Sequence, residues 1–272
     1  MRSFIVTLSA KYQLLFIVLC TIIIAFGSAL IIYLLFGSAD LIPKAGLITS
    51  IYKVLGTIYA VLIAFSISGV WQNYCASELA VAAEAAALLD LAHIMRAFNE
   101  KKSQPFCAIA INYLKQVIKL EWPLLAKGQN EKVMSPTSST YILSLKLVRE
   151  VQMIQPQNPR DTVIFSSALN LLTKWLDARR TRIMISKGNI AFALWPMLIA
   201  GAIILFAFHG LFIVENHRLW ATLLLLFSSV IGLSFYLIFT LDCPFGGTPA
   251  VGSGPFNWTL TWLSDQKSPD IE

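Results

Sequence analysis

The sequence predicts an all-α membrane protein with four transmembrane spans and a helical cytoplasmic domain between spans two and three. First, 57% of the 272 residues are hydrophobic and only 13% are charged, whereas soluble domains carry about a quarter charged residues. Second, four apolar stretches are each long enough to cross a bilayer as a helix. Third, the more polar segment between the second and third stretches has the apolar spacing of amphipathic helices.

The first expected span covers residues 13–36, a run without charge that is longer than the core of a signal peptide, so we expect it to be retained. The second covers residues 51–70, and its helix is expected to continue from Trp71 to Phe98, where no Pro or Gly interrupts it. A helix rises about 1.5 Å per residue, so this rod is expected to cross the lipid and extend into an aqueous domain.

The third and fourth spans, residues 190–214 and 219–241, are separated by only four residues, which predicts a tight antiparallel hairpin. The expected organisation is therefore, in chain order, residues 1–72 with spans one and two, residues 73–188 as the cytoplasmic helical domain, residues 189–241 as the transmembrane hairpin, and residues 242–272 as a cytoplasmic tail.

The central segment predicts three further helices after the rod. Residues 100–105 (EKKSQP) are expected to form a turn, followed by a helix over residues 105–126 with Pro105 in its first turn. A Ser/Thr-rich loop precedes a helix over residues 141–154. A last helix over residues 162–186, with Asp161 as its expected N-cap, leads back to the membrane.

Basic residues set the expected orientation. The segment 73–188 holds fifteen Lys and Arg against nine Asp and Glu, a net charge of +6. Arg2 and Lys11 precede the first span without an acid, while the loops 37–50 and 215–218 hold one basic residue each. By the positive-inside rule, both termini and the central domain are expected in the cytoplasm.

Charged residues close to the spans are the first candidates for a functional role. Arg179, Arg180 and Arg182 lie near the end of the last central helix. They could fix topology by contacting anionic lipid headgroups, or concentrate anions at a cytoplasmic pore mouth. Asp242 ends span four, where an acid is unfavourable against the helix dipole. A buried salt bridge to an arginine of the 179–182 cluster is the favoured explanation, and direct ion binding is the alternative.

Motifs of enzymes and metal sites are absent from the sequence. It contains no P-loop, no G-x-G-x-x-G, no H-E-x-x-H and no nucleophile elbow. The four cysteines (Cys20, Cys75, Cys107 and Cys243) form no C-x-x-C pair and are expected to be reduced thiols. We therefore expect no catalytic residues, no cofactor, no metal site and no nucleic-acid partner.

Three sequence motifs resemble the bacterial bestrophin-like family. They are W-x2-Y-x3-E-x5-EA from Trp71 to Ala85, Y-x3-V-x3-EWP-x-L from Tyr113 to Leu125, and LD-x-PF-x-G from Leu241 to Gly247. The likeness covers nearly the whole chain, although Cys243 stands where the family pattern leads us to expect Arg. The likeness to the bestrophin anion channels rests mostly on layout. It implies four spans, cytoplasmic termini in a bacterial inner membrane, and a second span that lines an anion pore.

If that layout holds, copies of span two surround an axis. The favoured pore-lining row is Thr57, Val61, Phe65 and Ser68, whose Thr and Ser flank a Val–Phe constriction able to gate by dewetting. A second row is Ile58, Leu62, Phe65 and Gly69. The ordinary alternative is helix–helix packing through Gly56, Ala60 and Ala64.

The leading functional hypothesis is a homo-oligomeric, bestrophin-like ion channel that favours anions, of pentameric or tetrameric size, with membrane lipids and small inorganic ions as its other partners. Glu84, Glu121 and Asp242 are expected to hold the cytosolic and membrane parts in register, although a solvated helix face explains the two glutamates equally well. The alternative is a membrane-anchored helical interaction or scaffold protein without transport activity. An enzyme is the weakest hypothesis.

Overall fold

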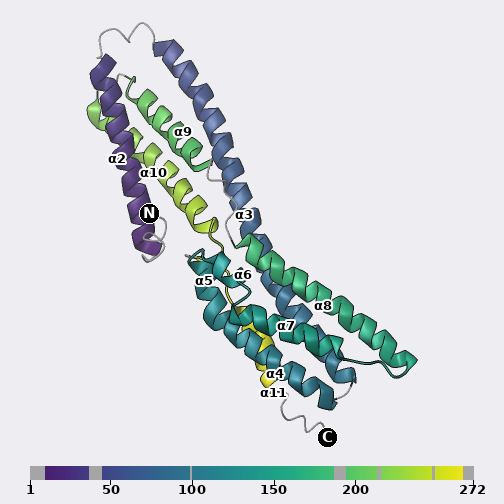
Figure 1. Ribbon diagram of the computed structural model, residues 1–272. Coiled ribbons are helices and arrows are strands. Elements are labelled where there is room, and N and C mark those ends of the chain that lie inside the picture. The colour runs from purple at the N-terminus through teal and green to yellow at the C-terminus, as the bar shows by residue number, and fades with distance from the viewer. Residues whose placement is uncertain are drawn as a thin grey trace. The chain divides into compact units, whose positions relative to one another are not determined.

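The computed structural model describes residues 10–36, 45–98, 100–186, 194–212, 216–246 and 249–265, and the regular structure in these ranges is entirely helical. This confirms the all-α class. The chain divides into two compact units, Met1–Gln72 with Asn189–Asp242, and Asn73–Gly188 with Cys243–Glu272. Figure 1 shows the helices of both units.

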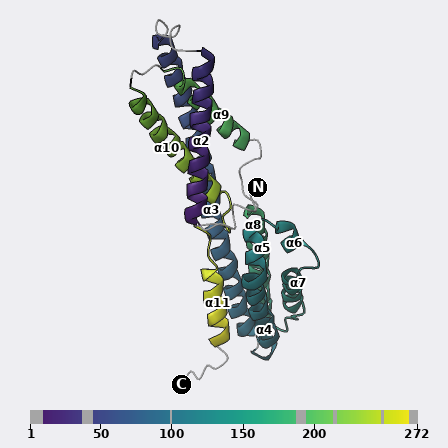
Figure 2. The ribbon, with the colours of Figure 1, turned by 90° about the vertical axis from the view of Figure 1, so that its left-hand side faces the viewer.

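The described part of the first unit contains α2 (Ala10–Phe36), the first part of α3 (Ala45–Phe98), α9 (Leu194–His209) and α10 (His217–Leu241). Helix α2 packs against both α9 and α10 (Figures 1 and 2). The rod predicted over residues 51–98 is confirmed, because α3 runs without a break from Ala45 to Phe98.

Glycines allow close contacts between these helices. A side chain at Gly210 would collide with the Ala29 carbonyl of α2, and one at Gly201 would overlap the ring of Tyr59. The Tyr59 hydroxyl donates a hydrogen bond to the Leu198 carbonyl at 2.8 Å, which attaches α3 to α9. Small residues therefore set the helix spacing in this unit, as is common between membrane helices.

Three helices in the described ranges are long and apolar enough to cross a membrane, namely Ala10–Leu35, Gly46–Phe98 and His217–Leu241. The span predicted over residues 190–214 coincides with α9, which has only 16 helical residues. That is short of the roughly 20 residues of a typical span. Residues 187–193 and 213–215 lie outside the described ranges, so the four-span count stays a prediction.

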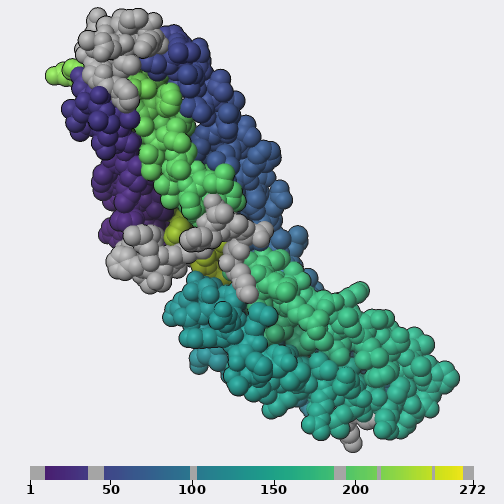
Figure 3. Space-filling view, turned by 45° about the horizontal axis from the view of Figure 1, so that its top comes forward, coloured from purple at the N-terminus to yellow at the C-terminus, as the bar shows by residue number. Residues whose placement is uncertain are grey.

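Helix α3 continues into the second unit, where it is joined by α4 (Glu100–Gln116), the π-helix η2 (Val117–Glu121), α5 (Trp122–Ala126), α6 (Asn130–Met134), α7 (Ser139–Gln152), α8 (Pro159–Ile185) and α11 (Gly254–Asp265). Helix α4 packs against α7 and α11, and α8 packs against α6 and α7. Figure 3 shows α7 and α8 next to each other on the visible face. Large side chains such as Leu88, Phe106 and Trp175 fill the core.

The local structure differs from the prediction at two helix starts. Residues 100–105 are helical rather than a turn, because α4 begins at Glu100 and includes Pro105. Helix α8 begins at Pro159 with Asn158, not Asp161, as its N-cap. The Asn158 Oδ1 accepts from the Asp161 amide at 2.8 Å, and the Asp161 carboxylate accepts from the Gln157 amide at 3.2 Å. The pairing differs from a capping box in that the carboxylate bonds the amide of the residue before the N-cap and not that of the N-cap itself.

Candidate functional site

A wide helical turn brings the acidic residue of the second motif into the core of the second unit. Between α4 and α5 the chain forms one π-helical turn, in which the Trp122 amide donates to the Val117 carbonyl. Pro123, the next residue, has no amide hydrogen to donate. In an uninterrupted α-helix Glu121 would lie about 80° around the axis from Tyr113, eight residues earlier, whereas the wider π-turn keeps both on one face. Tyr113, Val117 and Glu121 are accordingly all buried on that face.

Arg182 of α8 lies between two carboxylates. Its Nε donates to Glu84 Oε2 at 2.7 Å, and its Nη2 donates to Glu121 Oε2 at 2.7 Å. The Nη2 also lies 3.3 Å from Glu84 Oε1. Arg182 and Glu84 are both 0% exposed, and Glu121 is 1% exposed. Arg182 therefore links α3, η2 and α8 inside the core.

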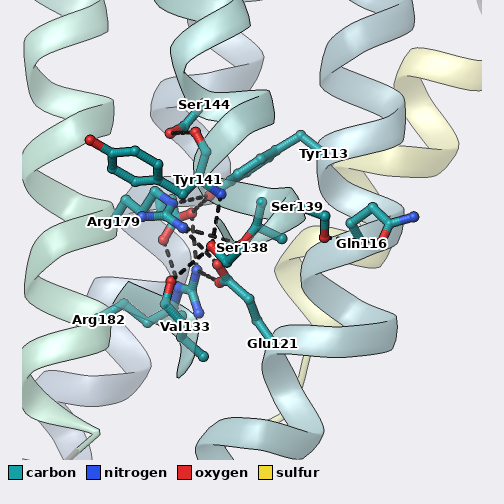
Figure 4. Close-up of polar contacts among 12 residues, drawn as sticks. Tyr113, Gln116, Glu121, Val133, Ser138, Ser139, Tyr141, Ser144, Arg179 and Arg182 are labelled. Atoms are coloured by element: carbon teal, nitrogen blue, oxygen red, sulfur yellow. Dashed lines mark hydrogen bonds and ion pairs between the residues drawn. The ribbon is translucent and has the colours of Figure 1, made fainter. Parts of the chain in front are cut away.

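Arg179, one turn earlier on α8, closes the arrangement (Figure 4). Its Nη2 donates to Glu121 Oε1 at 2.6 Å, and its Nε donates to the Tyr113 hydroxyl at 3.0 Å. That hydroxyl in turn donates to Glu84 Oε1 at 2.5 Å. The five side chains form a closed ring of hydrogen bonds, which we call the charge ring (Glu84, Tyr113, Glu121, Arg179 and Arg182).

Aromatic side chains enclose the charge ring. The Arg182 guanidinium carbon lies 5.5 Å from the ring centres of both Trp122 and Phe256. Trp122 also donates from Nε1 to the Val251 carbonyl at 3.1 Å, and its ring contacts Phe245. Guanidinium groups interact favourably with aromatic faces. The chain after α10 therefore packs against the same arginine as the two glutamates.

The charges of the ring compensate one another. Burial alone would raise the pKa of the Glu121 carboxyl, but Arg182 and Arg179 outweigh it and hold that pKa below its usual value. Burial and the adjacent Glu84 raise the pKa of the Tyr113 hydroxyl well above its ordinary value, so the hydroxyl remains a hydrogen-bond donor. Two carboxylates face two guanidinium groups, which leaves no net charge to attract an ion. The chemistry of this cluster is that of a structural clasp.

The predicted charged residues thus separate into two groups. Glu84, Glu121, Arg179 and Arg182 come together in the charge ring, so the solvated-face interpretation of the two glutamates is wrong. The expectation that all three arginines face headgroups or a pore mouth is also wrong. Arg179 and Arg182 are buried, and Arg180 alone is exposed, where it pairs with Asp177 at 3.2 Å.

Asp242 is buried at the end of α10, in the other unit, and its predicted pairing with an arginine of the 179–182 cluster stays a prediction. The sequence did not predict the hydroxyl of Tyr113 as part of the cluster, although two features of the sequence pointed to it. Arg179 and Arg182 are three residues apart and so share a helix face, and Tyr113 precedes Glu121 in one motif.

The predicted pore-lining row lies on an open face of α3. Thr57, Val61, Phe65 and Ser68 are all exposed in the single chain, whereas Tyr59, Ser66 and Val70 on the opposite face are buried. The exposed face also carries the small residues Ala60, Ala64 and Gly69.

Helix α2 exposes a different kind of surface. Its exposed side chains include Leu15, Leu19, Ile23, Ile31 and Leu34, which are large and aliphatic. Such a surface suits lipid chains, whereas small and hydroxyl-bearing residues suit contact with another helix or with water. Among the described residues, no group of three or more His, Cys, Asp or Glu side chains could hold a metal ion.

Comparison with known proteins identifies related sequences and folds. The family model described as a bestrophin-like domain matches residues 19–256. A crystal structure of a bacterial bestrophin homologue from Klebsiella pneumoniae is similar with a TM-score of 0.64 and 14% identity, covering 92% of this chain and 97% of that chain. A variant of that homologue with one mutation has a TM-score of 0.64 and 16% identity, covering 93% and 98%. The curated proteins include no match.

Proposed function

Because this chain belongs to the bestrophin-like family, we propose that it assembles as a homo-oligomer and conducts small inorganic ions through a pore lined by α3. The assembly is a ring of pentameric or tetrameric size in a bacterial inner membrane, with both termini in the cytoplasm. Ions cross by diffusion, and the proposal requires no cofactor and no covalent step.

The observation that carries this proposal is the open face of α3. Between Thr57 and Ser68, the residues on this face are apolar, small or hydroxyl-bearing. They are exposed, whereas the residues on the opposite face pack within the subunit. Copies gathered around an axis would cover this face and place Val61 and Phe65 at a narrow apolar neck. Such a neck restricts ions by dewetting or by width, and the flanking hydroxyl groups offer partial hydration.

The charge of the central segment supports a preference for anions. Residues 73–188 hold fifteen basic and nine acidic residues, which gives a net charge of +6. The charge ring removes two of each kind from contact with ions, which leaves thirteen against seven and the same net charge. The attraction for anions therefore comes from exposed residues such as Lys115, Lys119 and Lys174 and not from Arg179 and Arg182.

Ion flux from the purified full-length protein in liposomes tests the proposal. We expect chloride efflux that is abolished when protein is omitted, and a reversal potential in a salt gradient that follows the anion. A reversal potential that follows the cation would reject the anion preference alone. Vesicles that stay tight at every potential and pH would reject conduction.

The second candidate function is a membrane-anchored interaction module, which the absence of charged side chains on α3 between Val54 and Val70 favours, because a tether needs no polar path. Oligomeric state in detergent separates the two functions. A monomer cannot surround a pore with one copy of α3, so a strictly monomeric protein would support the tether.

A further inference from the structure

Helix α3 also has an open face in the second unit. Leu79, Ala82, Ala83 and Ala86 form a stripe along about two turns and are all exposed, with Leu79 71% exposed. Glu78 and Asp90 flank the stripe and are exposed as well. The opposite side of the helix carries Glu84 of the charge ring. We call this stripe with its two acids the α3 face.

Helix α7 carries an open face of the opposite charge. Ile142, Leu145 and Met153 are 43%, 52% and 66% exposed. Lys146 and Arg149 are exposed between them on the same side of the helix. Leu143, Leu147 and Val151, on the other side, are buried against the core. We call these five exposed residues the α7 face.

The two faces lie on opposite sides of the second unit. Helix α7 packs on α4 and α8. Helix α3 is attached to α4 and α8 through Glu84, which bonds Tyr113 and Arg182, so its open face points away from them. Figure 2 shows α7 on one side of this unit and α11 on the other. The His93 and Trp262 rings, 4.1 Å apart, place α3 beside α11.

We propose that the α3 face of one copy binds the α7 face of the next copy. This inference rests on the homo-oligomer of the proposed function and assigns its contact outside the membrane. Each face supplies exposed apolar side chains, whose burial drives association, and the acids of one face meet the bases of the other. A contact between two different surfaces on opposite sides of a subunit generates a ring when the rotation closes.

A lipid surface is a poorer occupant than a second copy. Anionic headgroups would attract Lys146 and Arg149 but repel Glu78 and Asp90. A neighbouring copy satisfies both faces at once, and the same pairing repeats around the ring.

Charge reversal of the full-length protein tests the contact, with native mass spectrometry in detergent as the measurement. The variants E78K/D90K and K146E/R149E each place like charges across the interface, and we expect each to raise the dissociation concentration on the order of tenfold or more. The chain carrying all four substitutions restores opposite charges and should assemble again. The control R160E/K174E reverses two exposed bases of α8 outside both faces and should assemble like the wild type.

Circular dichroism of each variant shows whether its helices are intact, and because the two reversals lie on different helices, one folded reversal suffices. Unchanged assembly of a folded reversal variant, or a fourfold variant that stays dissociated while both partners fold, would overturn the contact. A monomeric wild type would overturn both the contact and the pore. A wild type that assembles through these faces but leaves vesicles tight would retain the contact and reject only conduction.

Discussion

Arg182 is the residue on which the charge ring depends, since it pairs with both Glu84 and Glu121. In Arg182→Met the apolar side chain leaves two buried carboxylates with Arg179 as their remaining cation. Removing one partner of a buried ion pair costs about 3–5 kcal/mol. We expect a marked fall in thermal stability of the detergent-solubilised protein. Size-exclusion chromatography after heating measures this fall as the loss of the folded peak.

Arg180→Met is the matched control for that prediction. Arg180 pairs with Asp177 at the surface, and exposed pairs contribute about 0–1 kcal/mol. The double variant Arg182→Met with Glu84→Gln should recover part of the lost stability, because one buried charge has been removed. Equal stability of Arg182→Met and Arg180→Met would mean that the buried pairs contribute nothing.

Glu121 gives the charge ring a dependence on acid. Its pKa is lowered from an ordinary value of 4.5, so above pH 4.5 the carboxylate is charged in both the folded and unfolded states and its stabilisation is fully present. As pH falls below 4.5 the unfolded chain takes up the proton first, and the stabilisation is lost until the folded pKa is reached.

Thermal unfolding from about pH 7 to pH 3 should therefore show a steeper loss of stability for the wild type than for Glu121→Gln, which has no proton to take up at this position. The variant is expected to be less stable at pH 7, and the difference should shrink toward acid. Parallel curves would show that Glu121 does not contribute to acid sensitivity.

Residue-level prediction from the sequence succeeded where spacing carried the information. The motifs identified Glu84 and Glu121 as candidates, and the structure buries both in the charge ring. The spacing of the motifs did not predict whether these two side chains are buried. A glutamate at the same helical position can be exposed to water or can be buried against a cation. The burial of Arg179 and Arg182 depends on carboxylates 58 and 98 residues earlier in the chain. Helical periodicity relates residues within one helix and does not predict contacts between residues so far apart.

At the scale of elements, the π-turn fixes the direction of Glu121. Inserting one alanine after Lys119, an exposed residue of this turn, should rotate the following residues by about 100° relative to α4. Glu121 would then leave Arg179 and Arg182. We expect stability to fall at least as far as in Glu121→Gln, measured by the same heating assay.

Lys119→Ala is the control, because it removes the Lys119 side chain and keeps the length of the turn. Its stability should be close to that of the wild type because Lys119 is exposed. An insertion variant as stable as Lys119→Ala would show that the register of this turn has no part in placing Glu121.

Sequence patterns located long elements well and their interruptions poorly. The α3 rod was predicted because no Pro or Gly occurs between Trp71 and Phe98. The region 105–126 was predicted as one helix, but it contains the π-turn and a separate α5, since a single extra residue in a turn leaves little trace in hydrophobic spacing. The short α6 was not predicted, and α11 was treated only as part of a tail because its packing depends on distant partners such as His93.

At the scale of the whole molecule, the resemblance to the bestrophin-like family is confirmed by the family model over residues 19–256. The number of spans, the membrane orientation and the oligomer are not decided by a single chain, because each depends on lipid or on other copies. What the single chain does show is the unequal character of its exposed surfaces: large aliphatic side chains on α2, and small and hydroxyl-bearing residues interspersed with large apolar ones on α3. That inequality leads to the last prediction.

Phe65 and Leu34 are nearly equally exposed, at 74% and 72%, but lie on α3 and α2 respectively. If copies of α3 surround the pore, Phe65→Ala widens the apolar neck and weakens its dewetting, so the unitary current in planar bilayers should rise. Leu34→Ala removes a comparable apolar side chain from a surface that faces lipid, and its current should match the wild type. Equal currents for all three proteins, or an increase confined to Leu34→Ala, would place the conduction path away from the Thr57–Ser68 row.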